Sequence, residues 1–360
     1  MKEIREILSG IDEAEGPGVL ATVVDVKGSS YRLPGAKMLV FGDGSFVGTV
    51  SGGCVEADVL ERAKRVLGSG TPEIFLYDTT GDESSVFSLN MGCKGIVRIL
   101  LERVDAGSEY LGVFRRSIRE GIAGFVATRL LPDTEIGRAV FDREGSLTGG
   151  SVPKEASAFV RKLAADRHTA RRPAAIIGTE GDEYFIESVQ PPMHLLILGA
   201  GADAIPLADI AHRLGWRVTV ADHRPAYANK ERFPDADRIV VCRPEEMRDA
   251  VREAGSSAAV VMSHNFCNDT EYLKGLFAAD VEYIGALGPR VRTEEMLGKI
   301  SETDGPVGKE KLAKLHAPVG LDIGGTDPET IAVSIIAEIQ AAFSNREGGS
   351  LKDREGRIYD

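Results

Sequence analysis

The chain has 360 residues, more than one hydrophobic core usually organises, so its length predicts two or three domains. Hydrophobic residues make up 43% of it, which is enough to fill cores of that size. The formal net charge of -12, with no basic stretch, disfavours nucleic acid and acidic membrane surfaces, and we expect neither as a partner.

The chain begins with a charged, amphipathic stretch, Met1 to Ile7, and no apolar run approaches the length of a membrane span. We therefore expect a soluble, cytoplasmic protein. Four cysteines, Cys54, Cys93, Cys242 and Cys267, are too few and too scattered for a disulfide scaffold or a zinc site. We expect reduced thiols and no metal bound by protein ligands alone.

The first hundred residues mix strand and helix patterns, which predicts an α+β domain. Gly42-Asp43-Gly44 separates two apolar runs and predicts a hairpin, and Gly68 to Gly70 should end a helix. A polar stretch from Asp78 to Asn90 is too long for a tight turn, and such connections are usually functional or mobile. The expected elements are a short opening helix, strands at 19–26, 36–41, 45–50, 73–77 and 95–101, and a helix at 55–67.

Residues 105–190 carry helix and strand patterns, with a hairpin around Arg143-Glu144-Gly145, but contain no motif that predicts a chemistry. They form either a middle α+β segment or a part of the N-terminal domain at 1–104. At Pro191-Pro192 the pattern changes, and we place a third domain at 191–345, followed by a polar tail at 346–360.

The domain at 191–345 alternates uninterrupted apolar strands with helices, which is typical of a parallel sheet covered on both faces. Its last helix should begin at Asp327-Pro328, with aspartate as the N-cap and proline in the first turn. The fold class is therefore α/β, with a C-terminal Rossmann-type doubly wound sheet. The expected strands are 194–198, 217–221, 238–241, 258–262 and 282–286.

A dinucleotide-binding fingerprint lies at Gly199 to Ala204, between the first of these strands and a helix. Gly199 would permit the turn, and Gly201 would let the backbone approach a pyrophosphate. Asp222, at the end of the second strand, stands where a ribose-binding acid belongs. Arg224 follows closely and would either contact a 2'-phosphate or pair with Asp222. The alternative is a Rossmann sheet that keeps its glycines only for packing.

Two further polar residues lie near this fingerprint. Asp203 brings a negative charge to the helix start that would face a phosphate. His264 follows the strand at 258–262 and should lie at the nucleotide end of the sheet. It could act in catalysis, contact the ligand or have a structural role.

Two cysteines follow glycine turns. Cys54 ends Ser51-Gly52-Gly53-Cys54 just before a helix, where backbone N–H groups and the helix dipole stabilise an anion. Cys93 is followed by Lys94, whose charge favours a thiolate. The alternative is that each thiol is a small buried hydrophobic group.

Both halves of the chain carry an ordered set of motifs. The N-terminal motifs are Val19–Val24, Gly28–Arg32, Pro34–Met38 and Gly48–Glu56. The C-terminal motifs are Leu198–Gly201, Asp222 with Arg224-Pro225, Met262–Asn265, Tyr283–Gly288 and His316–Gly324. This set resembles the xanthine dehydrogenase accessory factor family, the XdhC/CoxI group. The family usually has glycine after the second cysteine, where this chain has Lys94.

The resemblance implies a chaperone that binds the molybdenum cofactor (molybdopterin), holds it while its terminal sulfur is installed, and delivers it to a xanthine dehydrogenase-type molybdoenzyme. It also implies a cysteine desulfurase as a further partner, and we expect a homodimer. The pterin phosphate would suit the glycine turns, and soft thiolates at Cys54 and Cys93 would suit molybdenum.

Two hypotheses therefore stand. The first is a non-catalytic cofactor chaperone with cofactor-binding residues Ser51, Gly52, Gly53, Cys54, Cys93, Gly199, Gly201, Asp222, Arg224 and His264. The second is an oxidoreductase that binds NAD, NADP or FAD on the Rossmann domain, with His264 or Cys54 as acid or nucleophile. We favour the first, because no second convergent set of titratable groups surrounds the nucleotide site. We expect no intrinsic xanthine oxidation, since the chain has no iron–sulfur cysteine framework.

Overall fold

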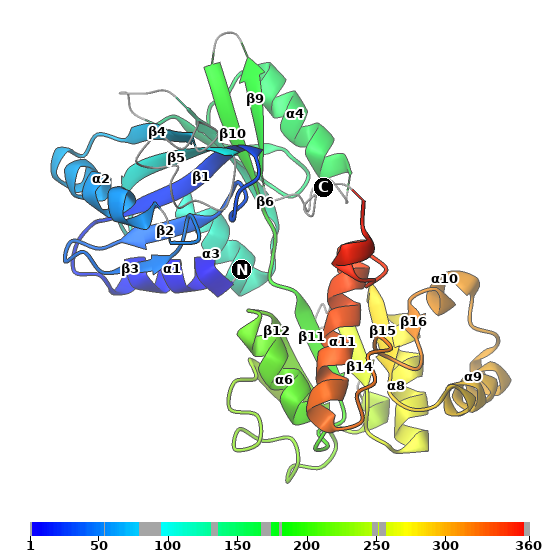
Figure 1. Cartoon of the computed structure of the whole chain (residues 1–360). Helices are drawn as coiled ribbons and strands as arrows, with labels where there is room; N and C mark the ends of the chain where they lie inside the picture. The colour runs from blue at the N-terminus through cyan, green and yellow to red at the C-terminus, as the bar shows by residue number, and fades with distance from the viewer. Residues whose placement is uncertain are drawn as a thin grey trace. The chain divides into compact units, whose positions relative to one another are not determined.

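The computed structural model describes residues 2–53, 55–78, 95–130, 136–166, 174–179, 182–246, 251 and 257–355. The chain divides into two compact units, Met1–Pro192 and Met193–Asp360. Within the described ranges, no helix is both long enough and apolar enough to span a membrane. We describe each unit by itself (Figure 1).

The N-terminal unit contains a first antiparallel sheet of five strands in the order β3-β2-β1-β5-β4. Helix α2 packs on one face of this sheet through Val59, Ala63 and Val66, and it ends at Gly70 in the left-handed conformation (φ 71°). Asp43 accepts a hydrogen bond from the backbone of Ser45, which closes the β2–β3 hairpin. The elements are α1 Lys2–Glu13, β1 Gly18–Gly28, β2 Lys37–Val40, β3 Phe46–Gly48, α2 Glu56–Ser69, β4 Glu73–Asp78 and β5 Gly95–Val104.

A second antiparallel sheet of five strands belongs to the same unit, in the order β8-β7-β6-β10-β9. Helix α4 packs on it through Val160. Its elements are α3 Leu111–Glu120, β6 Gly124–Arg129, β7 Arg138–Phe141, β8 Leu147–Gly150, α4 Lys154–Ala165, β9 Ala174–Thr179 and β10 Asp182–Val189.

The two sheets share a hydrophobic core in which α1 and α3 pack with residues of both, such as Leu20 in β1 and Val126 in β6. Buried charges cross this interface as well. Lys37 Nζ in β2 lies 2.5 Å from Glu187 Oε1 in β10, and Arg138 in β7 pairs with Glu102 in β5. Because each buried charge has a partner of opposite sign, these pairs fix how the sheets meet.

The C-terminal unit is built on a fully parallel sheet of six strands in the order β13-β12-β11-β14-β15-β16. The predicted Rossmann-type doubly wound sheet is therefore confirmed. The strands are β11 His194–Leu198, β12 Arg217–Asp222, β13 Arg238–Val241, β14 Ala258–Val261, β15 Tyr283–Ala286 and β16 Leu315–His316. The helices are α6 Ala204–Arg213, η1 Pro244–Glu246, α8 Phe266–Ala278, α9 Arg290–Asp304, α10 Lys309–Leu312, α11 Pro328–Phe343 and η2 Leu351–Asp353.

Successive residues of β11 face opposite layers, which explains its uninterrupted apolar sequence. Leu195 and Ile197 pack against α6 and α11, whereas Leu196 and Leu198 pack against α8 and α9. Figure 1 shows α6 and α11 as neighbours within this unit. Helix α11 begins as predicted, since Asp327 accepts a hydrogen bond from the backbone N–H of Thr330 (3.0 Å).

The expected strands of this unit agree with the structure to within one residue at either end. The sixth strand, Leu315–His316, was not predicted, because two residues are too few to show a periodic pattern. Most of the polar stretch from Asp78 to Asn90 lies outside the described residues.

Candidate functional site

The turn from Ser51 to Gly53 is anchored by Glu56, the first residue of α2. Ser51 Oγ donates to Glu56 Oε2, and the Ser51 backbone N–H donates to Glu56 Oε1 at 3.0 Å. Thr49 Oγ1 donates to the same Oε1 at 2.5 Å. Ser51 Oγ in turn accepts from the Gly53 backbone N–H at 3.1 Å, so one carboxylate holds the whole turn against the helix start.

The electrostatics of Glu56 agree with this anchoring. Burial alone would raise the pKa of its carboxyl, but hydrogen bonds from Ser51 and Thr49 outweigh burial and lower the pKa below its ordinary value. Glu56 is therefore a carboxylate at neutral pH. Its negative charge lies at the positive end of the α2 dipole, which also favours the ionised form.

Gly52 and Gly95, each two positions from a predicted cysteine in the sequence, both approach one loop of the N-terminal sheet, at 28–33. An added Cβ at Gly52 would lie 3.3 Å from the ring of Tyr31, which is 66% exposed. An added Cβ at Gly95, two positions after Cys93 in the sequence, would lie 2.4 Å from the carbonyl oxygen of Ser29. Glycine is thus required at Gly95, where the clash is with backbone, whereas at Gly52 a small shift of the exposed Tyr31 ring would make room.

The two cysteines themselves, Cys54 and Cys93, lie outside the described residues. Their assignment as cofactor ligands stays a prediction. What the structure describes is the chain on either side of Cys54, where Gly53 has a left-handed φ of 108° that an L side chain rarely adopts.

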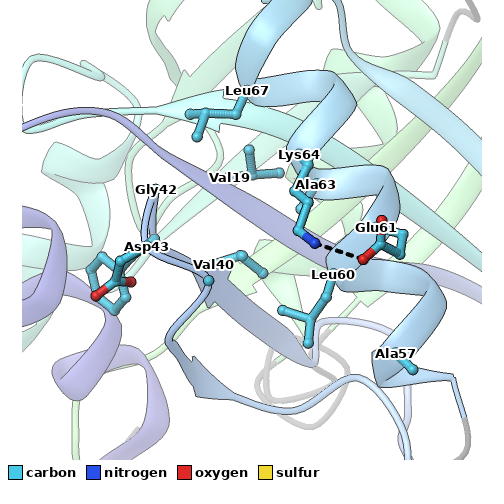
Figure 2. Close-up of a pocket in the computed structure, with 12 residues that line it drawn as sticks. Val19, Val40, Gly42, Asp43, Ala57, Leu60, Glu61, Ala63, Lys64 and Leu67 are labelled. Carbon is cyan, nitrogen blue, oxygen red and sulfur yellow. Dashed lines mark hydrogen bonds and ion pairs between the residues drawn. The ribbon is translucent and has the colours of Figure 1, made fainter.

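A separate cavity of about 310 Å³ lies along α2, between that helix and the β2–β3 hairpin (Figure 2). Apolar side chains such as Val19, Val40 and Leu60 line it, and an ion pair between Lys64 and Glu61 (2.6 Å) lies at the same face of α2. It includes none of the predicted site residues.

We expect Glu56→Ala to lower the stability of the N-terminal unit by about 1–2 kcal/mol, because the turn loses its shared acceptor while the site is only partly buried. Urea unfolding followed by far-UV circular dichroism measures this loss. Glu61→Ala is the matched control on the same helix: its ion pair with Lys64 is exposed (Figure 2), and its loss should cost less than about 0.5 kcal/mol. Equal effects of the two variants would contradict the anchoring role.

In the C-terminal unit, Gly199 fixes the glycine-rich turn against the turn that follows β14. Its φ is 114°, and an added Cβ would lie 2.5 Å from the backbone N and Cα of Ser263. The Gly199 backbone N–H donates to the carbonyl of Ala221 at 2.8 Å. Gly199 is therefore required by backbone conformation and by packing.

Gly201 has a different environment. An added Cβ would meet only His264 Cδ2, at 4.0 Å, so its lack of a side chain is not needed for packing. His264 itself has a left-handed backbone (φ 59°), and its Nε2 lies 2.9 Å from Asp203 Oδ2. The Asp203 charge at the start of α6 thus has an imidazole partner from the neighbouring strand end.

Asp222 is buried at the end of β12, and its carboxylate holds the glycine-rich turn. Oδ2 accepts the Ala200 backbone N–H at 2.8 Å, and Arg224 donates from Nε and Nη2 to the two oxygens at 2.9 and 2.8 Å. Burial alone would raise the pKa of Asp222, but these hydrogen bonds lower it to about 2. Arg224 pairs with Asp222, one of the two roles that the sequence left open.

A second carboxylate–arginine pair lies on the other side of the same turn. Asp269, in the first turn of α8, is buried and accepts from Ser263 Oγ at 2.5 Å. Arg292 in α9 donates from Nη1 to Asp269 Oδ2 at 2.8 Å. Through Ser263, this pair supports the backbone against which Gly199 packs.

Two arginine nitrogens beside the turn are buried and have no hydrogen-bond partner within the described part of the chain: Nε of Arg232 and Nη2 of Arg292. Arg232 also donates from Nη2 to the carbonyl of Ala200 at 3.2 Å. Because both nitrogens are closed to solvent, an anionic ligand would be bound by other N–H groups of these two guanidiniums.

The structure thus brings Gly199, Gly201, Asp222, Arg224 and His264 together at the carboxyl edge of the parallel sheet, and Ser51, Gly52 and Gly53 together in one turn of the other unit. Sequence reasoning did not assign Tyr31, Glu56, Arg232, Asp269 or Arg292 to a site. A signal existed for Asp269 and Arg292, since both lie shortly after an apolar strand ends.

Fold and site together define a Rossmann-type domain preceded by an N-terminal unit with a glycine-rich turn. Residues 195–339 match the XdhC Rossmann domain, and residues 12–78 match the XdhC and CoxI family. A probable xanthine dehydrogenase subunit from Bacillus subtilis is 31% identical over 94% of this chain and 97% of that protein. The chain belongs to the XdhC and CoxI family.

Two other similar proteins extend this comparison. The molybdenum cofactor insertion chaperone PaoD of Escherichia coli is 24% identical over 92% of this chain and 85% of that protein. A crystal structure of a xanthine dehydrogenase from Bacillus halodurans superposes with a TM-score of 0.78, at 30% identity, and covers 98% of both chains.

Proposed function

We propose that this chain is a non-catalytic accessory protein that holds the molybdenum cofactor and delivers it to a xanthine dehydrogenase-type molybdoenzyme. The observation that carries the proposal is the group of arginines that the structure gathers beside the glycine-rich turn, Arg224, Arg232 and Arg292, whose guanidinium groups suit an anion. The similarity to a named molybdenum cofactor insertion chaperone supports it.

The residues present fit a phosphate-bearing cofactor. Gly201 leaves the approach to the glycine-rich turn at the start of α6 open. Asp222 and Asp269 hold Arg224 and Arg292 in place before any ligand binds, so little ordering entropy remains to be lost.

The cofactor itself supplies the molybdenum centre, and this chain's part is to bind and shield it. We propose that Cys54 and Cys93 offer soft sulfur ligands, since their neighbours Gly52 and Gly95 both pack on the loop at 28–33. In this proposal the cofactor is held for sulfuration, with a cysteine desulfurase as sulfur donor and a homodimer as the working form.

The test is to purify the protein with its bound small molecules from a molybdenum-replete host and to identify pterin and nucleotide by mass spectrometry. We expect pterin with the native protein and at least tenfold less with Cys54→Ser. Cys242→Ser is the control, because burial raises the pKa of the Cys242 thiol and keeps it protonated.

Absence of pterin, with no change of any bound ligand in Cys54→Ser, would contradict the chaperone proposal. A bound nicotinamide nucleotide without pterin, together with hydride transfer seen as a change in NAD(P)H absorbance, would favour the oxidoreductase instead. Light scattering of the purified protein decides between monomer and homodimer.

A further inference from the structure

The end of β12 is the place where a Rossmann domain ordinarily accepts the hydroxyls of a ribose, but here the acid is fully engaged. Asp222 Oδ1 accepts from the backbone N–H and from Nε of Arg224, both at 2.9 Å. Oδ2 accepts from Ala200 N–H and from Arg224 Nη2, both at 2.8 Å. A carboxylate has about four lone-pair positions, so a ribose diol could bind only by displacing one of these donors.

Two guanidinium groups lie near one aromatic ring beside this carboxylate. The Arg224 guanidinium lies 3.9 Å from the centre of the Tyr227 ring, and that of Arg232 lies 5.1 Å from it. Arg224 uses one edge, Nε and Nη2, for Asp222, so its Nη1 N–H groups point away from that pair. Arg224 and Arg232 carry two positive charges and Asp222 carries one negative charge. These three residues therefore have a net positive charge, although the chain as a whole is acidic.

Arg232 is also held beside the glycine-rich turn. Its Nη2 donates to the carbonyl of Ala200 in the glycine-rich turn at 3.2 Å, which fixes the side chain beside the turn. Its Nε is buried and has no partner in the described ranges. A dianionic phosphate could accept from both arginines, whereas neutral hydroxyls would leave the net positive charge uncompensated.

We propose that Arg224 and Arg232, both beside the Tyr227 ring, form a subsite for a phosphate monoester, with Asp222 as the positioning residue that orients Arg224 and holds Ala200. This subsite rests on the proposed function and adds to it the chemical group that is recognised, a phosphate monoester. A ligand other than a pterin could bring the same group. Two ligands carry this chemistry: the terminal phosphate of the pterin cofactor and a 2'-phosphate on a nucleotide ribose.

The first arm of the test compares NADP⁺ with NAD⁺ by isothermal titration calorimetry, because the two differ only by the phosphate monoester. The second arm measures pterin retained through purification. The variant is Arg232→Gln, and the control is Arg213→Gln, which removes the same charge from an exposed position in the last turn of α6. Thermal unfolding of each variant shows whether it is folded.

If the nucleotide is the source, NADP⁺ binds at least about tenfold more tightly than NAD⁺, and Arg232→Gln abolishes that preference while Arg213→Gln keeps it. If the pterin is the source, Arg232→Gln loses pterin at least tenfold relative to Arg213→Gln, without a preference for NADP⁺. Arg232→Lys keeps the positive charge but loses the planar, forked set of guanidinium N–H donors. This variant should retain part of the preference for NADP⁺ or part of the bound pterin.

The subsite is overturned if folded Arg232→Gln keeps the wild-type pterin content and shows no change in NADP⁺ affinity, or if NAD⁺ binds as tightly as NADP⁺ and no pterin is bound. The proposed function can fail separately from the subsite. If the protein prefers NADP⁺ through Arg232 but never contains pterin, the subsite is supported and the chaperone role is contradicted.

Discussion

Replacing Gly199 with alanine is expected to destabilise the C-terminal unit by about 3–5 kcal/mol, whereas Gly201→Ala should change its stability by less than about 1 kcal/mol. The reason is geometric. At Gly199 the backbone has φ 114° and an added Cβ would lie 2.5 Å from the Ser263 backbone, but at Gly201 the nearest atom is 4.0 Å away. Two glycines two positions apart in one motif therefore have different roles.

Urea unfolding followed by tryptophan fluorescence measures this difference directly. The chain has a single tryptophan, and Trp216 is buried in the core between the sheet and α6, so its emission reports on the C-terminal unit alone. Gly201→Ala should keep the native transition but weaken binding of inorganic pyrophosphate at least tenfold, because its methyl group occupies the approach to the turn. A similar loss of stability in both variants would refute this division of roles.

The second large effect is expected from Asp222→Asn, which should lower stability at pH 7 by about 2–4 kcal/mol. Asparagine cannot accept both donors of Arg224 as a carboxylate does, and it leaves the guanidinium charge without its partner. Asp222→Asn would also weaken the hydrogen bond that the Ala200 backbone N–H donates to Asp222 Oδ2.

The effect should depend on pH with a definite sign. The pKa of Asp222 is lowered to about 2 in the folded state from 3.8, so its contribution is complete above pH 3.8 and is lost as the pH falls toward 2. That contribution is about 2 kcal/mol. The difference in unfolding free energy between wild type and Asp222→Asn should therefore shrink between pH 4 and pH 2.

Trp216 fluorescence in urea at a series of pH values measures this difference, and subtraction of the two proteins removes the acid sensitivity of all other carboxyls. Asp235→Asn is the control, because Asp235 is an exposed carboxyl in the same segment of the chain. A gap between wild type and Asp222→Asn that stays constant down to pH 2 would show that the charge of Asp222 does not stabilise the fold.

Much of the fold could be predicted from the sequence because its signals are local. The apolar run at 194–198, the glycines at 199 and 201, and the cap at Asp327-Pro328 each lie within a few residues of the structure they specify. The turn from Ser51 to Gly53 could be predicted for the same reason. Strand β16 could not, because its two residues pair with β15 only when the rest of the sheet is present.

Apart from the pairing of Asp222 with Arg224, which the sequence offered as one of two roles, the contacts of the glycine-rich turn could not be predicted, because they join residues far apart in the chain. His264 and Asp203 are 61 positions apart, and Arg232 and Ala200 are 32 apart. Which polar residues meet at a strand end depends on strand order, and β11 lies between β12 and β14 rather than beside β13. The order of the strands in the sheet cannot be read from the periodicity of the sequence.

By itself the sequence determined the α/β class, the position of the Rossmann domain and the family motifs, because backbone conformation and amphipathic periodicity are properties of short segments. Only the tertiary structure decided how the polar groups are used. Asp222 holds the glycine-rich turn and Arg224, and Arg232 donates to the carbonyl of Ala200 in the same turn, because a buried charge takes its role from the partners that the packed strands bring to it.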